Sequence, residues 1–245
     1  MPPGCSCAGR SPWSSPAGGS TRRCPDGRGR LLFAYLTLSR LQPVPRDVIV
    51  DALWGGSPPP AAASALTVLV SKVRAALGPD VLRGRTELTL ALPEPAYVDV
   101  EDAFAALHAA ESALARQDWR KAWAPALTAQ FVTRRRFLPE AEQPWADPWR
   151  RRLADVHVRA LECYATACLR LGGAELPGAE RAARELLEVA PLRETGHLLL
   201  MEALAARGNV AEALAAYERL RVLLRESLGV DPCRAVQDTY AQLLG

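Results

Sequence analysis

Residues 61–77 are bounded by proline on both sides. Pro58, Pro59 and Pro60 precede the segment, and Gly78-Pro79 follows it. Proline is tolerated only in the first turn of a helix, and glycine followed by proline is a stop signal, so the segment is predicted to be one helix. At 100° per residue a narrow apolar stripe runs along it, which consists of Leu66, Leu69, Val70, Val73 and Leu77.

The opposite arc of this helix carries hydroxyl groups and cations but no acidic residue. Short hydroxyl side chains allow a close approach, and long cations reach phosphates or base edges, which suits a helix in a DNA major groove. Taken alone, this chemistry favours an ordinary amphipathic helix with a solvated face, because charged outer faces are the rule. The candidate DNA contacts on this arc are Ser64, Thr67, Ser71, Lys72 and Arg74.

Two shorter helices are expected before this one. Residues 30–41 form an apolar helix that Pro43 and Pro45 end, and residues 46–54 form a second helix. The Gly- and Pro-rich loop 55–60 then leads into the long helix. Three helices in this order with short links are typical of a helix-turn-helix unit.

Residues 81–92 are rich in β-forming residues and contain a glycine turn, which predicts a β-hairpin. A hairpin directly after the third helix is a wing, and its tip would carry Arg83 and Arg85. Basic side chains at such a tip suit the phosphate backbone or the minor groove. A plain turn with solvated arginines explains the local sequence equally well.

From residue 99 onward the chain reads as helix after helix. The short turns and the small residues Ala182 and Ala213, 31 positions apart, are typical of tetratricopeptide-like repeats, which form a concave surface for a partner. The fold class is therefore mainly α: an incomplete winged helix-turn-helix at 30–98, then an all-α tetratricopeptide-like domain at 99–245. The helices are expected at 100–117, 118–132, 149–171, 178–190, 193–207 and 210–228, with a last one after Asp231-Pro232 and with Asn209 as an N-cap.

Residues 1–29 show no apolar period and are expected to be disordered or a misassigned start. The six cysteines form no CxxC pair, and the net charge of +3 neither demands nor excludes nucleic acid. No apolar run approaches a membrane span, and the N-terminus lacks the apolar core of a signal peptide, so a cytoplasmic protein is expected.

Residues 45–78 closely resemble the helix-turn-helix of the SARP/AfsR-type regulators, and residues 191–232 resemble the end of their bacterial transcriptional activator domain. The resemblance implies an OmpR-type winged DNA-binding domain, with helix 61–77 as the recognition helix. It also implies recruitment of RNA polymerase, which would face a loop formed by Trp54, Gly55, Gly56 and Ser57. The family's N-terminal sheet has no counterpart in residues 1–29, which is why the domain is expected to be incomplete.

The predicted function is a sequence-specific DNA-binding transcriptional regulator, in the main an activator. Its expected partners are double-stranded DNA and RNA polymerase, a homodimer is left open, and no membrane is expected. The alternative is a helical-repeat interaction module whose DNA-binding half no longer works. No phosphate loop occurs, and His108, His157 and His197 have no ligand or catalytic partners at suitable spacing, so an enzyme, a metal and a cofactor are not expected.

Overall fold

The computed structural model describes residues 4–5, 27–93 and 96–245. The chain divides into two compact units. The N-terminal unit consists of Met1–Asp102 together with Arg135–Leu153, and the helical unit consists of Ala103–Arg134 together with Ala154–Gly245. The segment Arg135–Leu153, which lies between helical parts of the chain, thus belongs to the N-terminal unit.

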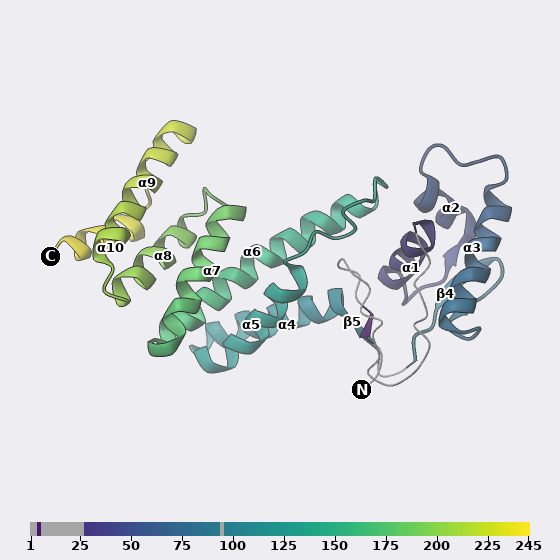
Figure 1. Cartoon of the computed structure of the whole chain (residues 1–245), viewed down its shortest axis with the longest axis horizontal. Coiled ribbons are helices and arrows are strands. Elements are labelled where there is room, and N and C mark those ends of the chain that lie inside the picture. Colours follow the sequence, from purple (N-terminus) through teal and green to yellow (C-terminus); the bar gives the residue numbers. More distant parts are fainter. Residues whose placement is uncertain (1–3, 6–26, 94–95) are drawn as a thin grey trace. The chain divides into compact units, whose positions relative to one another are not determined.

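The N-terminal unit contains the three helices that the sequence predicted (Figure 1). They are α1 (Arg28–Leu38), α2 (Arg46–Trp54) and α3 (Ala62–Leu77). The apolar stripe of α3 faces inward, because Leu66, Val70 and Val73 are buried while Leu69 and Leu77 are half-buried. The side chains that are at most 1% exposed in this core are Leu32, Leu36, Ile49, Leu53, Leu66, Val73, Leu82 and Leu88.

The predicted hairpin is present as strands β3 (Leu82–Arg83) and β4 (Glu87–Leu90). They pair antiparallel, with Leu82 opposite Leu90. A third strand that the sequence did not predict, β2 (Val44–Pro45), pairs antiparallel with the other side of β4. Since the strand order is β2-β4-β3, proline lies on an edge strand, where its missing N–H breaks no ladder.

The N-terminal segment differs from the expectation at two places. Gly4–Cys5 forms β1, which pairs in parallel with β5 (Tyr97–Val98), so these two residues are not without regular structure. Helix α1 begins at Arg28, two residues before the predicted start. Residues 1–3 and 6–26, for which disorder was also predicted, lie outside the described part of the chain.

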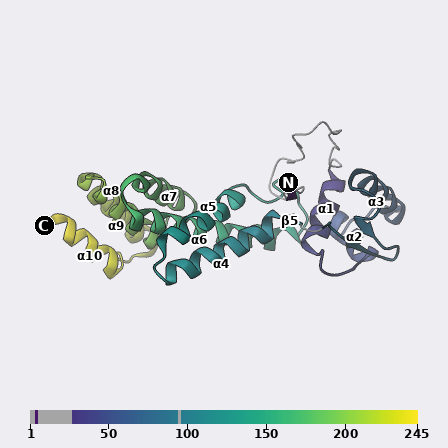
Figure 2. The same cartoon turned by 90° about the horizontal axis from the view of Figure 1, so that it is seen from below.

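The second half of the chain is helical, as predicted. In the helical unit, α8 packs against α7, α9 and α10, and Figure 2 shows α7, α8 and α9 close together. All or most of each helix from α4 to α10 lies in the helical unit. The bounds are α4 (Asp99–Ala115), α5 (Trp119–Thr133), α6 (Ala146–Leu171), the 3-10 turn η1 (Gly173–Glu175), α7 (Leu176–Val189), α8 (Glu194–Ala206), α9 (Val210–Leu228) and α10 (Arg234–Leu244).

Small residues let the helices of this unit approach closely. Ala182 and Ala213, which suggested the repeat, are both buried. A Cβ atom added at Gly178 would lie 3.2 Å from the Cys168 sulfur, which is a tight contact, so α7 and α6 approach closely at this glycine. Asn209 occupies the N-cap position of α9, as predicted, but its side chain makes no cap hydrogen bond.

Two buried histidines lie in the helical unit. His157 on α6 has Nδ1 3.1 Å from the Thr133 hydroxyl and Nε2 3.5 Å from a Glu185 carboxylate oxygen. Glu185 is distant from His157 in the sequence, and the fold brings it beside the ring from α7. Burial lowers the pKa of His157 and of His197, and the charge of Glu185 only partly opposes this at His157.

The depressed histidine pKa values predict acid sensitivity of the helical unit. Below about pH 6.5 the histidines of the unfolded chain bind protons more readily than the buried histidines of the folded chain. The free energy of unfolding is therefore highest above that pH and declines as the pH falls. Each histidine contributes at most about 1.4 kcal/mol per pH unit. Urea unfolding between pH 7.5 and 5.5 measures this decline, and we expect His157→Gln to reduce it. The matched control His108→Gln replaces an exposed histidine and should leave it unchanged.

Gly84 sets the turn of the wing. It has a φ of +97°, and an added Cβ would lie 1.9 Å from the Glu87 carbonyl oxygen, so no side chain fits without moving the backbone. We expect Gly84→Ala to destabilise the N-terminal unit by about 1–3 kcal/mol, the usual range for such strain. Urea unfolding measures the loss, and hydrogen exchange should place it in 82–90. The control is Gly56→Ala, since a Cβ there meets open space; equal losses in both variants would contradict this reading.

Candidate nucleic-acid interface

The outward face of α3 carries most of the predicted DNA contacts. Ser64, Thr67, Ser71 and Lys72 are all exposed on it, and α3 contains no acidic residue. Among the described residues, Lys72 has no ion-pair partner. The 53% exposed Val68 lies on the same face and offers an apolar contact for a thymine methyl group. This face therefore combines hydroxyl groups, one unneutralised cation and an apolar side chain.

Arg74 is used within the protein itself. Its Nε donates to the Leu82 carbonyl oxygen at 2.8 Å, and a terminal nitrogen donates to the Gly84 carbonyl oxygen at 2.8 Å. The guanidinium thereby joins the last turn of α3 to β3 and to the turn of the wing. Its predicted contact with DNA stays a prediction, but the structure shows a different set of bonds that fix the wing.

Arg46, which the sequence did not single out, makes a second connection of this kind. Its guanidinium donates to the Thr67 hydroxyl at 2.8 Å and to the Arg85 carbonyl oxygen at 3.3 Å. Its backbone N–H donates to the Thr86 carbonyl oxygen at 3.2 Å. The first residue of α2 thus binds both α3 and the wing tip and places a further positive charge beside the exposed face.

The two wing arginines have different surroundings. Arg83 is exposed, and its Nε donates to the Asp80 carbonyl oxygen at 3.0 Å. Arg85 is exposed at the turn, and its side chain has no hydrogen bond or ion pair with any described residue. Both side chains are outside the core, so both can reach a phosphate, and Arg85 has no internal bond to give up.

The loop after α2 begins at Gly55, because Trp54, which was predicted as part of this loop, is the last residue of α2. Trp54 is half-buried, and the Arg28 guanidinium lies 5.3 Å from the centre of its ring. Gly55 has a positive φ of 61° and its N–H donates to the Asp51 carbonyl oxygen, which ends the helix. Gly56 and Ser57 are exposed. The loop therefore leaves the capped end of α2 with its tip exposed, and its predicted contact with RNA polymerase stays a prediction.

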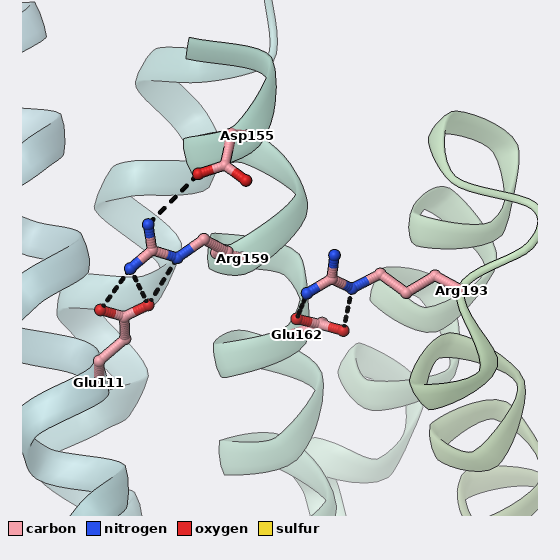
Figure 3. Close-up of polar contacts among 5 residues, drawn as sticks. All are labelled: Glu111, Asp155, Arg159, Glu162 and Arg193. Carbon is pink, nitrogen blue, oxygen red and sulfur yellow. Dashed lines mark hydrogen bonds and ion pairs between the residues drawn. The ribbon is translucent and has the colours of Figure 1, made fainter. Parts of the chain in front are cut away.

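The helical unit holds a ladder of ion pairs across α4, α6 and the start of α8 (Figure 3). Arg159 lies between Glu111 and Asp155, and Arg193 faces Glu162. Hydrogen bonds to Glu111 and to Glu162 raise the pKa of Arg159 and Arg193 respectively. Because these charges satisfy one another, the ladder fixes neighbouring helices and offers no open charge to a ligand.

The cysteines of α6 are unsuited to nucleophilic chemistry. Burial raises the pKa of the Cys163 thiol to about 12 and that of the Cys168 thiol to about 11. Both thiols therefore stay protonated at neutral pH, and the thiolate is the reactive form. Among the described residues, no group of three or more His, Cys, Asp or Glu could hold a metal ion. The described helices also include none with the length and apolar character needed to cross a membrane.

Comparison with known proteins identifies relatives that cover 88% of this chain. The family model of the Bacterial transcriptional activator domain matches residues 98–244. The chain is 33% identical over 217 residues to the Regulatory protein AfsR of Streptomyces coelicolor, which covers 88% of this chain and 22% of AfsR. It is 26% identical over 237 residues to the Transcriptional regulatory protein MoaR1 of Mycobacterium tuberculosis, which covers 88% of this chain and 71% of MoaR1. The chain thus spans about a fifth of the length of AfsR.

A solved structure supports the fold. EmbR of Mycobacterium tuberculosis, solved in complex with a low affinity phosphopeptide, superposes with a TM-score of 0.75 at 24% sequence identity. The match covers 90% of this chain and 60% of the EmbR chain. At this identity the likeness establishes the fold, which is the mainly helical one that the sequence predicted.

The bonds of Arg74 predict a stability effect that Lys72 does not share. Arg74→Met keeps most of the aliphatic stem but removes both donors to the wing, so we expect the N-terminal unit to lose about 1–2 kcal/mol. Lys72→Met is the matched control on the same helix and should change stability by less than about 0.5 kcal/mol. Urea unfolding gives both values. Faster hydrogen exchange in residues 82–90 of the Arg74 variant alone would locate the loss in the wing.

Proposed function

The chain belongs to the SARP-type family of bacterial transcriptional regulators, and from this premise we propose that it binds duplex DNA sequence-specifically and recruits RNA polymerase. The observation that carries the proposal is the acid-free outer face of α3, where Lys72 has no internal partner. In this proposal α3 enters the major groove, and Ser64, Thr67 and Ser71 supply hydrogen bonds to phosphates or base edges.

The basic side chains of the N-terminal unit have two proposed roles, according to the hydrogen bonds that they already make. Lys72 contacts DNA directly, and Arg83 and Arg85 hold the wing to the phosphate backbone. Arg46 and Arg74 keep the wing at a fixed position against α3, since both already donate to wing carbonyl groups. A helix and a wing that are held together bind DNA with less loss of conformational entropy than two separate elements.

The remaining partners follow from the family and from the exposed loop. We place RNA polymerase at Trp54, Gly55, Gly56 and Ser57, because this loop leaves a fixed helix end and its tip is exposed. The helical unit is assigned to protein contacts, either with a second copy of the chain or with another protein, as is usual for repeat folds. The protein would act in the cytoplasm, where bacterial promoters are found.

The alternative of a repeat module with a non-functional DNA-binding half predicts a poorly built N-terminal unit. Instead this unit has a closed core of leucine, isoleucine and valine and two arginines that fix the wing. These features weigh against the alternative. Selection of bound sequences from random duplex DNA with the purified chain decides between them, because the alternative predicts that no sequence is enriched.

Once a bound sequence is known, Lys72 provides a quantitative test. We expect Lys72→Ala to weaken binding and to lower the slope of log affinity against log salt concentration by about one, the change for one lost phosphate contact. Fluorescence anisotropy at several salt concentrations measures the slope. The only other lysine of the chain is Lys121, on α5, so Lys121→Ala is a control of equal charge change. If both variants have the same slope, the proposed contact between Lys72 of α3 and a phosphate is wrong.

A further inference from the structure

Residues 137–146, which we call the strap, follow α5, end at the first residue of α6 and belong to the N-terminal unit. Phe137, Leu138, Ala141 and Ala146 are all buried. The ring of Trp145 meets that of Tyr35 on α1 edge to face, with the ring centres 5.1 Å apart. The strap therefore belongs to the same compact unit as α1 and contacts it through Trp145, although it lies far along the chain.

The strap donates hydrogen bonds to the carbonyl groups that α2 leaves open. The last four carbonyl groups of any helix lack a partner within it. In α2, Trp145 Nε1 donates to the Ala52 carbonyl oxygen at 2.8 Å, and Gln143 Nε2 donates to that of Leu53 at 3.3 Å. The Gly55 N–H donates to Asp51 at 2.8 Å. Of these three hydrogen bonds to the last carbonyl groups of α2, two thus have their donors in the strap.

The strap itself is held in one conformation. The Arg150 guanidinium donates to the carbonyl oxygens of Phe137 at 3.1 Å, Leu138 at 2.6 Å and Ala141, and it forms an ion pair with Asp147 at 2.7 Å. Leu138 has a φ of +41°, a conformation that a leucine keeps only when its surroundings impose it. Trp145 is therefore presented to α2 at a fixed place.

The recognition helix is held by other bonds. Helix α3 is fixed by its buried stripe and by Arg46 and Arg74, which join it to α2 and the wing. The donors of the strap act at the opposite end of α2 from Arg46, next to the loop Trp54–Ser57. A change at the strap donors thus alters the start of this loop while the contacts of α3 remain.

We propose that Trp145 and Gln143 are positioning residues for the loop Trp54–Ser57, and that they separate recruitment of RNA polymerase from DNA affinity. The inference rests on the proposed function for the identity of the loop's partner. By occupying the Ala52 and Leu53 carbonyl groups, the two side chains fix the end of α2 and the direction in which the loop departs. Without them DNA binding persists and activation is lost.

The test uses the full chain with Trp145→Phe, which keeps an aromatic ring beside Tyr35 and removes the donor. Hydrogen exchange at the Gly55 amide reports on the end of α2, because that amide closes the helix. We expect its exchange to rise about five-fold, the contribution of one ordinary hydrogen bond. Affinity for the selected DNA should stay within about two-fold, and transcription from a promoter carrying that DNA should fall at least about five-fold.

Controls separate this role from general destabilisation. Trp119→Phe, at the start of α5 in the helical unit, should change neither exchange at Gly55 nor transcription. Gln143→Met removes only the longer of the two bonds and serves if Trp145→Phe does not fold; we expect smaller changes in the same direction. Unchanged exchange at Gly55 overturns the proposal, as does a loss of DNA affinity equal to the loss of transcription. If the wild-type chain binds no DNA, the proposed function fails, and exchange at Gly55 still decides the role of the strap.

Discussion

The orientation of α3 depends on three buried side chains, Leu66, Val70 and Val73, which turn one flank of the helix into the core. Because a helix repeats every 3.6 residues, burying this flank leaves Ser64, Thr67, Ser71 and Lys72 outside. An acidic residue on the exposed flank would cost the fold little, yet α3 has none. The absence is therefore not required by packing, and it agrees with a surface that meets phosphate.

The basic side chains near α3 differ in the hydrogen bonds that they make within the protein, and this difference suits them to different roles. A guanidinium has five N–H donors in a planar fork, so Arg46 and Arg74 can each join two elements through carbonyl or hydroxyl oxygens. An ammonium group is a compact point charge and suits a single phosphate. The arginines thus hold the helix and wing together, and Lys72 remains available to a ligand.

The parts of the fold that could be predicted from the sequence are those with a local cause. The stripe of α3, the glycine turn of the wing and the helices of the second half follow from periodicity and from Gly or Pro at helix ends. Strand β2 could not be predicted, because Pro45 indicates a break and only pairing with β4 makes it an edge strand. The hydrogen bonds of Arg46 and Arg74 could not be predicted from the sequence either, because only the tertiary fold brings their acceptors close.

The strap shows that a boundary in sequence need not be a boundary in packing. Residues 135–153 lie within the match to the Bacterial transcriptional activator domain, yet they belong to the N-terminal compact unit. The cause is the end of α2, where the buried Leu53 and its neighbour Ala52 have carbonyl groups that need donors. Gln143 and Trp145 supply them from a distant part of the chain. The N-terminal unit is therefore completed by residues that lie within the match to the Bacterial transcriptional activator domain, and two of them donate hydrogen bonds to the end of α2.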